Sequence, residues 1–273
     1  MRTRRGGSER VQSPGALPTE AVKTSFATAR LQMRDTGVLL LLDETESSWI
    51  DLRDPTHLDF EYLQQMDAVL SCLRGRSAPV RAVHLGGAGC ALARAWAASR
   101  PGSQQLAVEI DAILAQKVRE WFDLPRSPQL RIRVGDAAQV VRTLRTGEWD
   151  VVVRDVFARG LVPPACTGRG FLAECRRALA PGGIYLANSV APPRDAVAAE
   201  LAHLRELFGA ALVVADPAVI RGRRPGNLVL VARAQPWTEE ELAGMERAVR
   251  RLPLPVRTWR AEDPALPQPS RSG

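Results

Sequence analysis

Short apolar runs alternate with amphipathic stretches of roughly ten residues over most of the chain. The apolar runs predict strands at 80–85, 105–110, 130–134, 150–155, 184–188, 212–215 and 227–232. The amphipathic stretches predict helices at 57–73, 90–99, 113–122, 137–144, 170–179, 195–208 and 239–252. Such alternation is typical of βαβ units. We therefore expect an α/β fold with a doubly wound, mostly parallel sheet of seven strands, in which the last two could form a hairpin.

A different pattern precedes this region. Turn residues separate three short strand-like stretches, at 29–33, 38–43 and 49–52. We therefore expect a small N-terminal β unit at 26–56, followed by the alternating α/β domain at 57–252. The ends of the chain are rich in Pro, Ser and Arg, which predicts a disordered tail at 1–25 and a flexible Pro-rich tail at 253–273.

The apolar content excludes two classes of protein. At 45% of 273 residues it is too high for an intrinsically disordered chain. Apolar runs such as 38–42 are far shorter than the roughly 20 residues that cross a bilayer. The basic N-terminus lacks the apolar segment of a signal peptide. We expect a cytoplasmic protein without membrane contact.

The net charge of +7 could indicate a nucleic-acid partner, but its distribution disfavours one. Residues 1–36 carry seven cationic and three anionic side chains, and residues 251–273 carry four and two. Only +1 remains for residues 37–250, where a folded binding surface would need its basic stripe. The distribution of charge therefore argues against a nucleic-acid partner.

The cysteines and histidines show no metal-binding pattern. No two of the four cysteines form a CxxC pair, and the three histidines are scattered. Their positions are Cys72, Cys90, Cys166, Cys175, His57, His84 and His203. We expect reduced thiols, no disulfide framework and no metal site.

Ligands of doubly wound sheets bind at the carboxyl ends of the strands, where a glycine turn is the first candidate. The segment 86–89, Gly-Gly-Ala-Gly, follows a predicted strand and opens a helix. Read from Gly87, the dinucleotide pattern G-x-G-x-x-G/A fails at its last position, which is Leu92. Alone, the segment is also consistent with a tight turn that binds nothing.

Two carboxylates strengthen the case for a ligand. Glu109 ends the second strand of the α/β domain, where a carboxylate accepts hydrogen bonds from ribose hydroxyls. Asp136 ends the third strand, before Ala137, and could cap the next helix or accept from an adenine amino group. With the turn, these positions describe a nucleoside pocket formed by Gly86, Gly87, Gly89, Glu109, Asp136 and Ala137. The missing third glycine favours an adenosine without a pyrophosphate.

This pattern resembles the class I S-adenosylmethionine-dependent methyltransferase fold, a Rossmann-like architecture. The segment 150–155 (Asp-Val-Val-Val-Arg-Asp), its Pro-containing loop and the stretch 179–183 (Leu-Ala-Pro-Gly-Gly) resemble spermidine synthases. So do Leu42-Asp43, Asp51-Leu52 and Phe60-Glu61-Tyr62 in and after the small β unit. The resemblance is to the spermidine synthase-like proteins of actinobacteria and covers roughly residues 37–232.

The resemblance implies a transferase of polyamine biosynthesis and assigns its residues. Such enzymes move an aminopropyl group from decarboxylated S-adenosylmethionine to putrescine and release methylthioadenosine. Because alkylamines have a pKa of about 10, the acceptor needs a base, and the resemblance assigns that role to Asp155. It places Tyr62 and Gln64 in the substrate cleft. It also implies a small-molecule amine substrate and a homo-oligomer.

Two positions depart from the family and leave alternatives open. Ala88 stands where the family's glycine turn carries an acid, and Ala158 stands where a second acid holds the far amine. The chain could transfer an aminopropyl group to a polyamine or another amine. It could instead transfer a methyl group from S-adenosylmethionine to an unknown small substrate, which would tolerate Ala88. A third possibility is a non-catalytic relic that binds a nucleoside.

Overall fold

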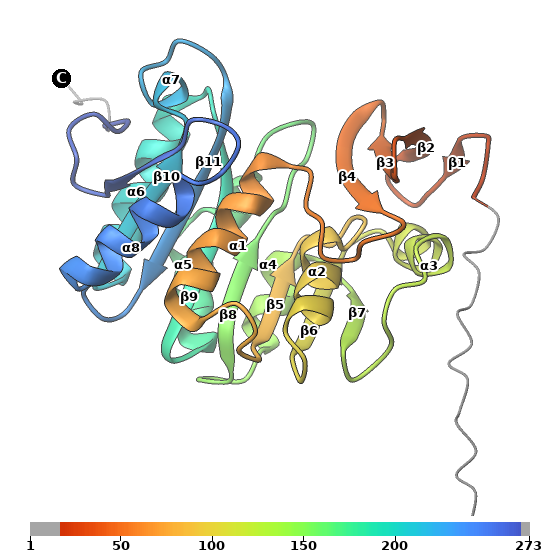
Figure 1. The fold of residues 1–273 in the computed structure, drawn as a ribbon, viewed down its shortest axis with the longest axis horizontal. Coiled ribbons are helices and arrows are strands. Elements are labelled where there is room, and N and C mark those ends of the chain that lie inside the picture. The colour runs from red at the N-terminus through yellow and green to blue at the C-terminus, as the bar shows by residue number, and fades with distance from the viewer. Residues whose placement is uncertain (1–16, 269–273) are drawn as a thin grey trace, which may run out of the picture.

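The computed structural model describes residues 17–268, which form two sheets and the helices that cover them (Figure 1). The smaller sheet is an antiparallel meander in the order β1-β2-β3-β4. Its strands are β1 (Val22–Lys23), β2 (Thr28–Arg34), β3 (Gly37–Leu42) and β4 (Thr45–Asp51). It lies beside helix α3, at one end of the larger sheet.

Strand β3, one of the two inner strands of the small sheet, is apolar at nearly every position because both of its faces are covered. Val38 and Leu40 belong to the core that includes α3. Leu39 and Leu41 pack on the opposite face against Trp49. This double burial explains why the run does not alternate between apolar and polar residues.

Within the described residues, the larger sheet has eight strands in the order β12-β10-β11-β9-β8-β5-β6-β7. Its strands are β5 (Arg81–Leu85), β6 (Gln104–Glu109), β7 (Leu130–Val134), β8 (Trp149–Arg154), β9 (Leu179–Ala191), β10 (Ala210–Ala215), β11 (Gly226–Arg233) and β12 (Arg257–Arg260). Strands β5 to β9 pair in parallel, whereas β11 runs antiparallel to both β9 and β10. The seven predicted strands and the final hairpin are therefore present.

Helices cover both faces of this sheet, as the doubly wound pattern predicts (Figure 1). They are α1 (Glu61–Arg74), α2 (Ala91–Ser99), α3 (Ala112–Trp121), α4 (Ala137–Val140), α5 (Arg169–Ala178), α6 (Arg194–Leu207), α7 (Pro217–Ile220) and α8 (Glu239–Val249). On β8, Val151 and Val153 pack with α1 and α8, while Val152 packs with α5 and α6. No helix of residues 17–268 is long and apolar enough to cross a membrane.

The eighth strand, β12, corrects the prediction of a flexible tail from residue 253. Residues 257–260 pair with β10, and Trp259 packs against the main core. Four residues between prolines carry too short an alternation to predict a strand from the sequence. Residues 269–273 lie outside the described part of the chain.

The prediction of a disordered tail at 1–25 is also wrong for its last residues. Leu17 packs against the core of the small sheet, and Thr24 is buried. The backbone N–H groups of Ser25 and Phe26 donate to the Asp111 carboxylate, at 3.0 and 2.9 Å. The first sixteen residues of that prediction lie outside the described residues.

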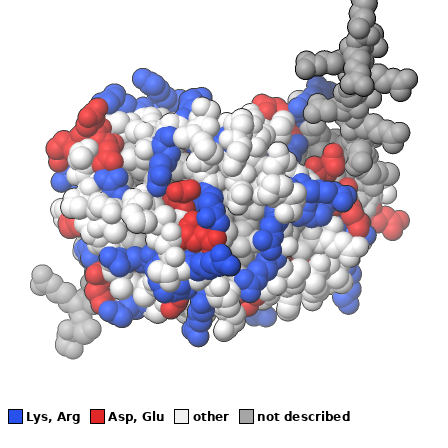
Figure 2. All heavy atoms as spheres, turned by 90° about the horizontal axis from the view of Figure 1, so that it is seen from below, with Lys and Arg blue, Asp and Glu red and all other residues white. Residues whose placement is uncertain are grey.

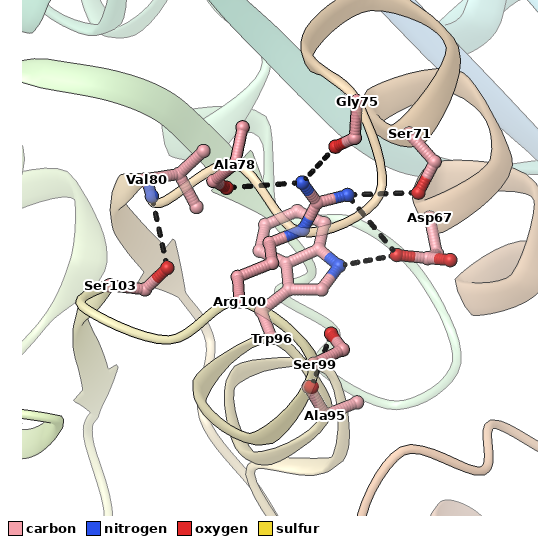
Figure 3. Close-up of polar contacts among 10 residues, drawn as sticks. All are labelled: Asp67, Ser71, Gly75, Ala78, Val80, Ala95, Trp96, Ser99, Arg100 and Ser103. Carbon is pink, nitrogen blue, oxygen red and sulfur yellow. Dashed lines mark hydrogen bonds and ion pairs between the residues drawn. The ribbon is translucent and has the colours of Figure 1, made fainter.

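A buried arginine links α1 to α2 (Figure 3). Arg100, at the end of α2, is 1% exposed and donates to the Gly75 carbonyl at 2.6 Å and to Ser71 Oγ at 2.9 Å. Its guanidinium lies 3.7 Å from Asp67, which also accepts from Trp96 Nε1 at 2.9 Å. These contacts fix the helix whose first turn carries Tyr62.

Charge on the face seen from below in Figure 1 is mixed. Figure 2 shows Lys and Arg in groups around a central cluster of acidic side chains, rather than as one uninterrupted basic surface. Basic and acidic side chains also form ion pairs elsewhere on the described surface, as between Arg34 and Glu46 at 3.1 Å.

Candidate active site

The strand order reverses next to β5, which lies between β6 and β8. Backbone hydrogen bonds align the strand ends there: Asp155 N–H donates to the Leu85 carbonyl at 2.8 Å, and Gly86 N–H donates to the Val108 carbonyl at 3.0 Å. The turn after β5 therefore lies between the ends of β6 and β8. This edge of the sheet is the expected place for a ligand in a doubly wound fold.

The glycines of the turn are required by its close approach to other strands. Gly86 has a φ of +96°, and a Cβ there would lie 2.1 Å from the Asp155 carbonyl oxygen. A Cβ on Gly87 would lie 3.2 Å from the Cβ of Glu109. A Cβ on Gly89 would lie 2.7 Å from the Cβ of Ser48, on β4. The turn is thus packed between three strands, with one proposed ligand-binding acid on each side of it.

Glu109 is buried at the end of β6 and is fixed by backbone donors. Its Oε2 accepts from Ala88 N–H at 2.7 Å and from Gly87 N–H at 3.3 Å, and its Oε1 accepts from Asp111 N–H at 2.9 Å. A carboxylate has about four lone-pair sites, so these three bonds leave one acceptor site for a hydroxyl group. The turn and the carboxylate therefore hold each other in place.

The two neighbouring aspartates are helix caps. Asp136 caps α4 through a 3.1 Å hydrogen bond from Gln139 N–H, remains exposed, and is followed by the buried Ala137. Asp111 caps α3 through Leu114 N–H at 2.8 Å. Burial raises the pKa of Asp111, but its hydrogen bonds, including those from Ser25 and Phe26, outweigh this effect and hold the pKa at about 2. Asp111 thus remains ionised and anchors the N-terminal segment.

Asp155 follows β8, and both of its carboxylate oxygens are hydrogen-bonded. Tyr62 Oη donates to Oδ2 at 2.9 Å, and Asn188 Nδ2 donates to Oδ1 at 3.0 Å. Burial raises the pKa of Asp155, and the hydrogen bonds from Asn188 and Tyr62 act in the opposite direction. Burial and the nearby Asp155 charge raise the pKa of Tyr62 well above its usual range, so its phenol stays a hydrogen-bond donor.

Asn188 and Asn227 were missed by the sequence analysis. Asn188 ends the predicted strand 184–188, so examining the end of that strand would have found it. Asn227 donates from Nδ2 to Asn188 Oδ1 at 3.0 Å. It lies at the start of β11, and only an antiparallel strand brings its first residues to the carboxyl edge of the sheet.

Arg154 precedes Asp155 and points to the other face of the sheet, as alternation along a strand predicts. It is fully buried, pairs with Glu200 of α6 and donates to Ser189 Oγ at 2.9 Å. Ser189 Oγ in turn donates to Glu200 at 2.6 Å. Arg154 thus has its anionic partner on the opposite face of the sheet, while its buried Nε has no hydrogen-bond partner, and among residues 17–268 no ion pair reaches Asp155.

Gln64, predicted to line the cleft, turns back to the start of its own helix. Its Nε2 donates to the carbonyl oxygens of Leu58 at 2.8 Å and Asp59 at 3.3 Å. The described contacts of Gln64 thus fix the entry to α1, and the residue that reaches Asp155 from this helix is Tyr62. Two positions on a helix are about 200° apart, so Tyr62 and Gln64 cannot both face Asp155.

The loop after Asp155 presents apolar side chains. Phe157 is 39% exposed and Leu161 is 50% exposed. Ala158 and Leu161 exchange backbone hydrogen bonds at 2.8 and 3.1 Å, which close the loop tightly. Among residues 17–268, no group of three or more His, Cys, Asp or Glu side chains could hold a metal ion.

Comparison with known proteins gives matches over most of the chain, although no family model matches it. The chain is 31% identical to a probable spermidine synthase from Corynebacterium glutamicum, with a TM-score of 0.83. That match covers 93% of this chain and 96% of the other. This chain is also 30% identical over 151 residues to a polyamine aminopropyltransferase from Chromobacterium violaceum. The latter match covers 55% of this chain and 56% of the relative, so the chain spans about half the length of that curated relative.

A third similarity concerns the fold alone. Human methyltransferase-like protein 13, solved in complex with SAH, matches with a TM-score of 0.58 at 24% identity. The match covers 71% of this chain and 94% of that chain. The larger sheet and its helices therefore have the class I methyltransferase architecture, to which the chain adds the small antiparallel sheet.

Proposed function

The chain belongs to the spermidine synthase-like family, and from that premise we propose that it transfers an aminopropyl group from decarboxylated S-adenosylmethionine to an amine. One observation carries the proposal. The glycine turn contacts Glu109 through two N–H groups on one side and abuts the Asp155 backbone on the other. A nucleoside held at Glu109 would thus have its sulfur substituent directed toward Asp155.

The nucleoside end of the substrate fits the residues present. Glu109 retains an acceptor site for a ribose hydroxyl, and its orientation is fixed before any ligand arrives. The exposed Asp136, at the neighbouring strand end, would accept from an adenine amino group. The SAH in methyltransferase-like protein 13 is an adenosine thioether, as is the methylthioadenosine that aminopropyl transfer releases.

Asp155 would act as the base. In the transfer, the acceptor nitrogen forms a bond to the propyl carbon while the bond from that carbon to sulfur breaks, with its electron pair going to sulfur. The proton leaving nitrogen passes to Asp155, whose ionised form the donors Tyr62 and Asn188 stabilise. Burial raises the pKa of Asp155, so its carboxylate takes up this proton more readily. The attack also depends on alignment, which the fixed strand ends provide.

The acceptor would be a polyamine such as putrescine or another primary amine. The side chain of Asp155 supplies one anionic group for it, and the loop that follows supplies Phe157, Ala158 and Leu161. From family membership we also infer a homo-oligomer in the cytoplasm. Sedimentation of the purified protein would test the oligomeric state, and cell fractionation would test the location.

Methyl transfer from S-adenosylmethionine is the second candidate. Ala88 favours it, because an acid at this position would repel the carboxylate that the intact methionine moiety carries. The likeness to the methyltransferase is weaker, at a TM-score of 0.58 against 0.83 for the probable spermidine synthase. The third candidate is a non-catalytic protein that binds a nucleoside.

Product analysis by mass spectrometry tests the proposal. The protein and its Asp155→Asn variant would be incubated with decarboxylated S-adenosylmethionine and putrescine. We expect methylthioadenosine and spermidine from the native protein alone. If neither product forms with a panel of amines, aminopropyl transfer is wrong, and S-adenosylhomocysteine formation from S-adenosylmethionine tests the second candidate.

A further inference from the structure

Four polar side chains from four elements form one hydrogen-bonded chain through the proposed base. Tyr62 of α1 donates to Asp155 Oδ2 at 2.9 Å, and Asn188 of β9 donates to Asp155 Oδ1 at 3.0 Å. Asn227 of β11 donates to Asn188 Oδ1 at 3.0 Å. Asn188 is 2% exposed, whereas Asn227 lies at the surface. This series of hydrogen bonds therefore runs from the solvent-exposed Asn227 to the carboxylate of Asp155.

The direction of these bonds is set by chemistry. An ionised carboxylate only accepts, so Asn188 must turn its Nδ2 toward Asp155 and its Oδ1 away. Asn227 meets that Oδ1 with an N–H donor. If the Asn188 amide were flipped, oxygen would face carboxylate and nitrogen would face nitrogen. The ionised carboxylate therefore selects this orientation of Asn188, and the donor from Asn227 stabilises it.

The backbone of Asn188 is fixed independently of its side chain. It pairs with Val229 in the β9–β11 ladder. Its carbonyl oxygen accepts from Arg154, the buried partner of Glu200 on the opposite face of the sheet. A side chain on such a backbone has few orientations open to it, which makes the amide flip its main remaining freedom.

We propose that Asn188 and Asn227 are positioning residues of the transfer reaction, in which Asn227 acts through Asn188 to hold the Asp155 carboxylate in its productive orientation. This role rests on the proposed function of Asp155 as the base. With Oδ1 held by Asn188, the oxygen beside Tyr62, Oδ2, is the one that takes the proton. Neither asparagine touches the reacting atoms in this scheme.

The test uses Asn188→Ala, which removes the donor, and Asn227→Asp, which replaces a donor by an isosteric acceptor and so favours the flipped amide. Asn227→Ala is the neutral control. Hydrogen bonds to charged groups are worth about 1.5–3 kcal/mol, so Asn188→Ala should lower kcat/KM by about tenfold to a hundredfold. The acid limb of its pH profile should move up by about one unit or more. We expect a smaller shift for Asn227→Ala than for Asn227→Asp.

A new carboxylate at position 227 would also repel Asp155 directly, so the double variant Asn188→Ala/Asn227→Asp separates the two effects. If Asn227 acts through Asn188, most of the Asn227→Asp shift disappears in the Asn188→Ala background. If Asn227→Asp shifts the acid limb equally in both backgrounds, Asn227 does not act through Asn188, and the proposed relay from Asn227 through Asn188 to Asp155 is overturned. An Asn188→Ala protein that keeps its melting temperature and the native pH profile would also overturn it.

A second readout does not depend on turnover. The carboxyl carbon of Asp155 can be titrated by NMR in ¹³C-aspartate-labelled, ligand-free protein, with Asp155→Asn assigning the signal. We expect the same order of midpoints: native lowest, then Asn227→Ala, then Asn227→Asp. If these shifts appear but no amine yields methylthioadenosine, the link from Asn227 through Asn188 to Asp155 is confirmed, whereas aminopropyl transfer, and with it a positioning role in that reaction, is wrong. Unchanged midpoints in the variants would overturn the relay whatever the activity.

Discussion

Tyr62 precedes Asp155 by 93 residues, yet its phenol donates a 2.9 Å hydrogen bond to the Oδ2 of that carboxylate. Helix α1 carries the phenol and lies against the face of the sheet formed by Val151 and Val153, next to the end of β8. The bond stabilises ionised Asp155, because a donor favours the charged form of a carboxylate.

Replacing Tyr62 by Phe removes this donor and keeps the ring. We expect the pKa of Asp155 to rise, so the acid limb of kcat/KM against pH moves upward by about one unit. At pH 6 the loss of activity should exceed the loss at pH 8. Phe60→Leu is the control, since Phe60 packs 6.0 Å from the Tyr62 ring but reaches no carboxylate there. An unmoved acid limb in Tyr62→Phe would contradict the assignment.

Glu109→Gln tests the nucleoside site. An amide at this position turns a donor either toward the N–H groups of Gly87 and Ala88 or toward that of Asp111, so one backbone contact is lost in each orientation. We expect the affinity for methylthioadenosine, measured by calorimetry, to fall at least about tenfold, equal to about 1.4 kcal/mol. Glu120→Gln, an exposed acid of α3, should bind normally. Equal affinities of native protein and Glu109→Gln would remove Glu109 from the site.

Gly86→Ala should destabilise the protein far more than Gly75→Ala. Both glycines have positive φ, +96° and +82°, so both substitutions incur backbone strain of about 1–3 kcal/mol. Only at Gly86 does the new Cβ meet a neighbour, the Asp155 carbonyl oxygen at 2.1 Å, whereas nothing lies within 4 Å at Gly75. Urea unfolding should show a difference of about 2 kcal/mol or more. Equal losses of unfolding free energy in the two variants would show that the turn accommodates a Cβ at Gly86 by a small shift.

We expect the free energy of unfolding to fall in mild acid because His84 is buried in its neutral form. It is 4% exposed on β5, bonded to Gln105 at 2.8 Å, and burial lowers its pKa from 6.5 to about 4. Between these values the unfolded chain binds the proton and the folded chain does not. Stability from this group is therefore complete above pH 6.5 and falls by up to about 3 kcal/mol toward pH 4.

The matched variant for this prediction is His84→Asn, which keeps a neutral polar group but does not titrate. Its unfolding free energy should change less between pH 7 and pH 4.5 than that of the native protein, measured by urea unfolding. The same pH dependence in both proteins would assign the acid sensitivity to other groups.

Arg154 and Glu200 should be coupled. Both side chains are buried, at 0% and 2% exposure. Arg154→Met leaves a buried carboxylate without its cation and should cost about 3–5 kcal/mol. The double variant Arg154→Met/Glu200→Leu removes both charges and should be more stable than Arg154→Met alone. A double variant less stable than the single one would show that the pair itself, rather than its compensation, stabilises the fold.

The sequence by itself determined the alternating architecture, because strand and helix periods are local properties of the chain. It also located Gly86, Glu109, Asp136 and Asp155, since the end of a parallel strand can be read from where its apolar run stops. The helix cap that the sequence allows at Asp136 follows from the same local logic.

Only the tertiary structure decided how these strand ends are joined and used. Tyr62 and Asn188 reach Asp155 from elements whose neighbours are set by strand order. Asn227 reaches Asn188 because β11 runs antiparallel to β9. Strand β12 was invisible for a related reason: four residues among prolines form a strand only when β10 offers an edge. Contacts between residues tens of positions apart depend on register and packing, which no local period of the sequence encodes.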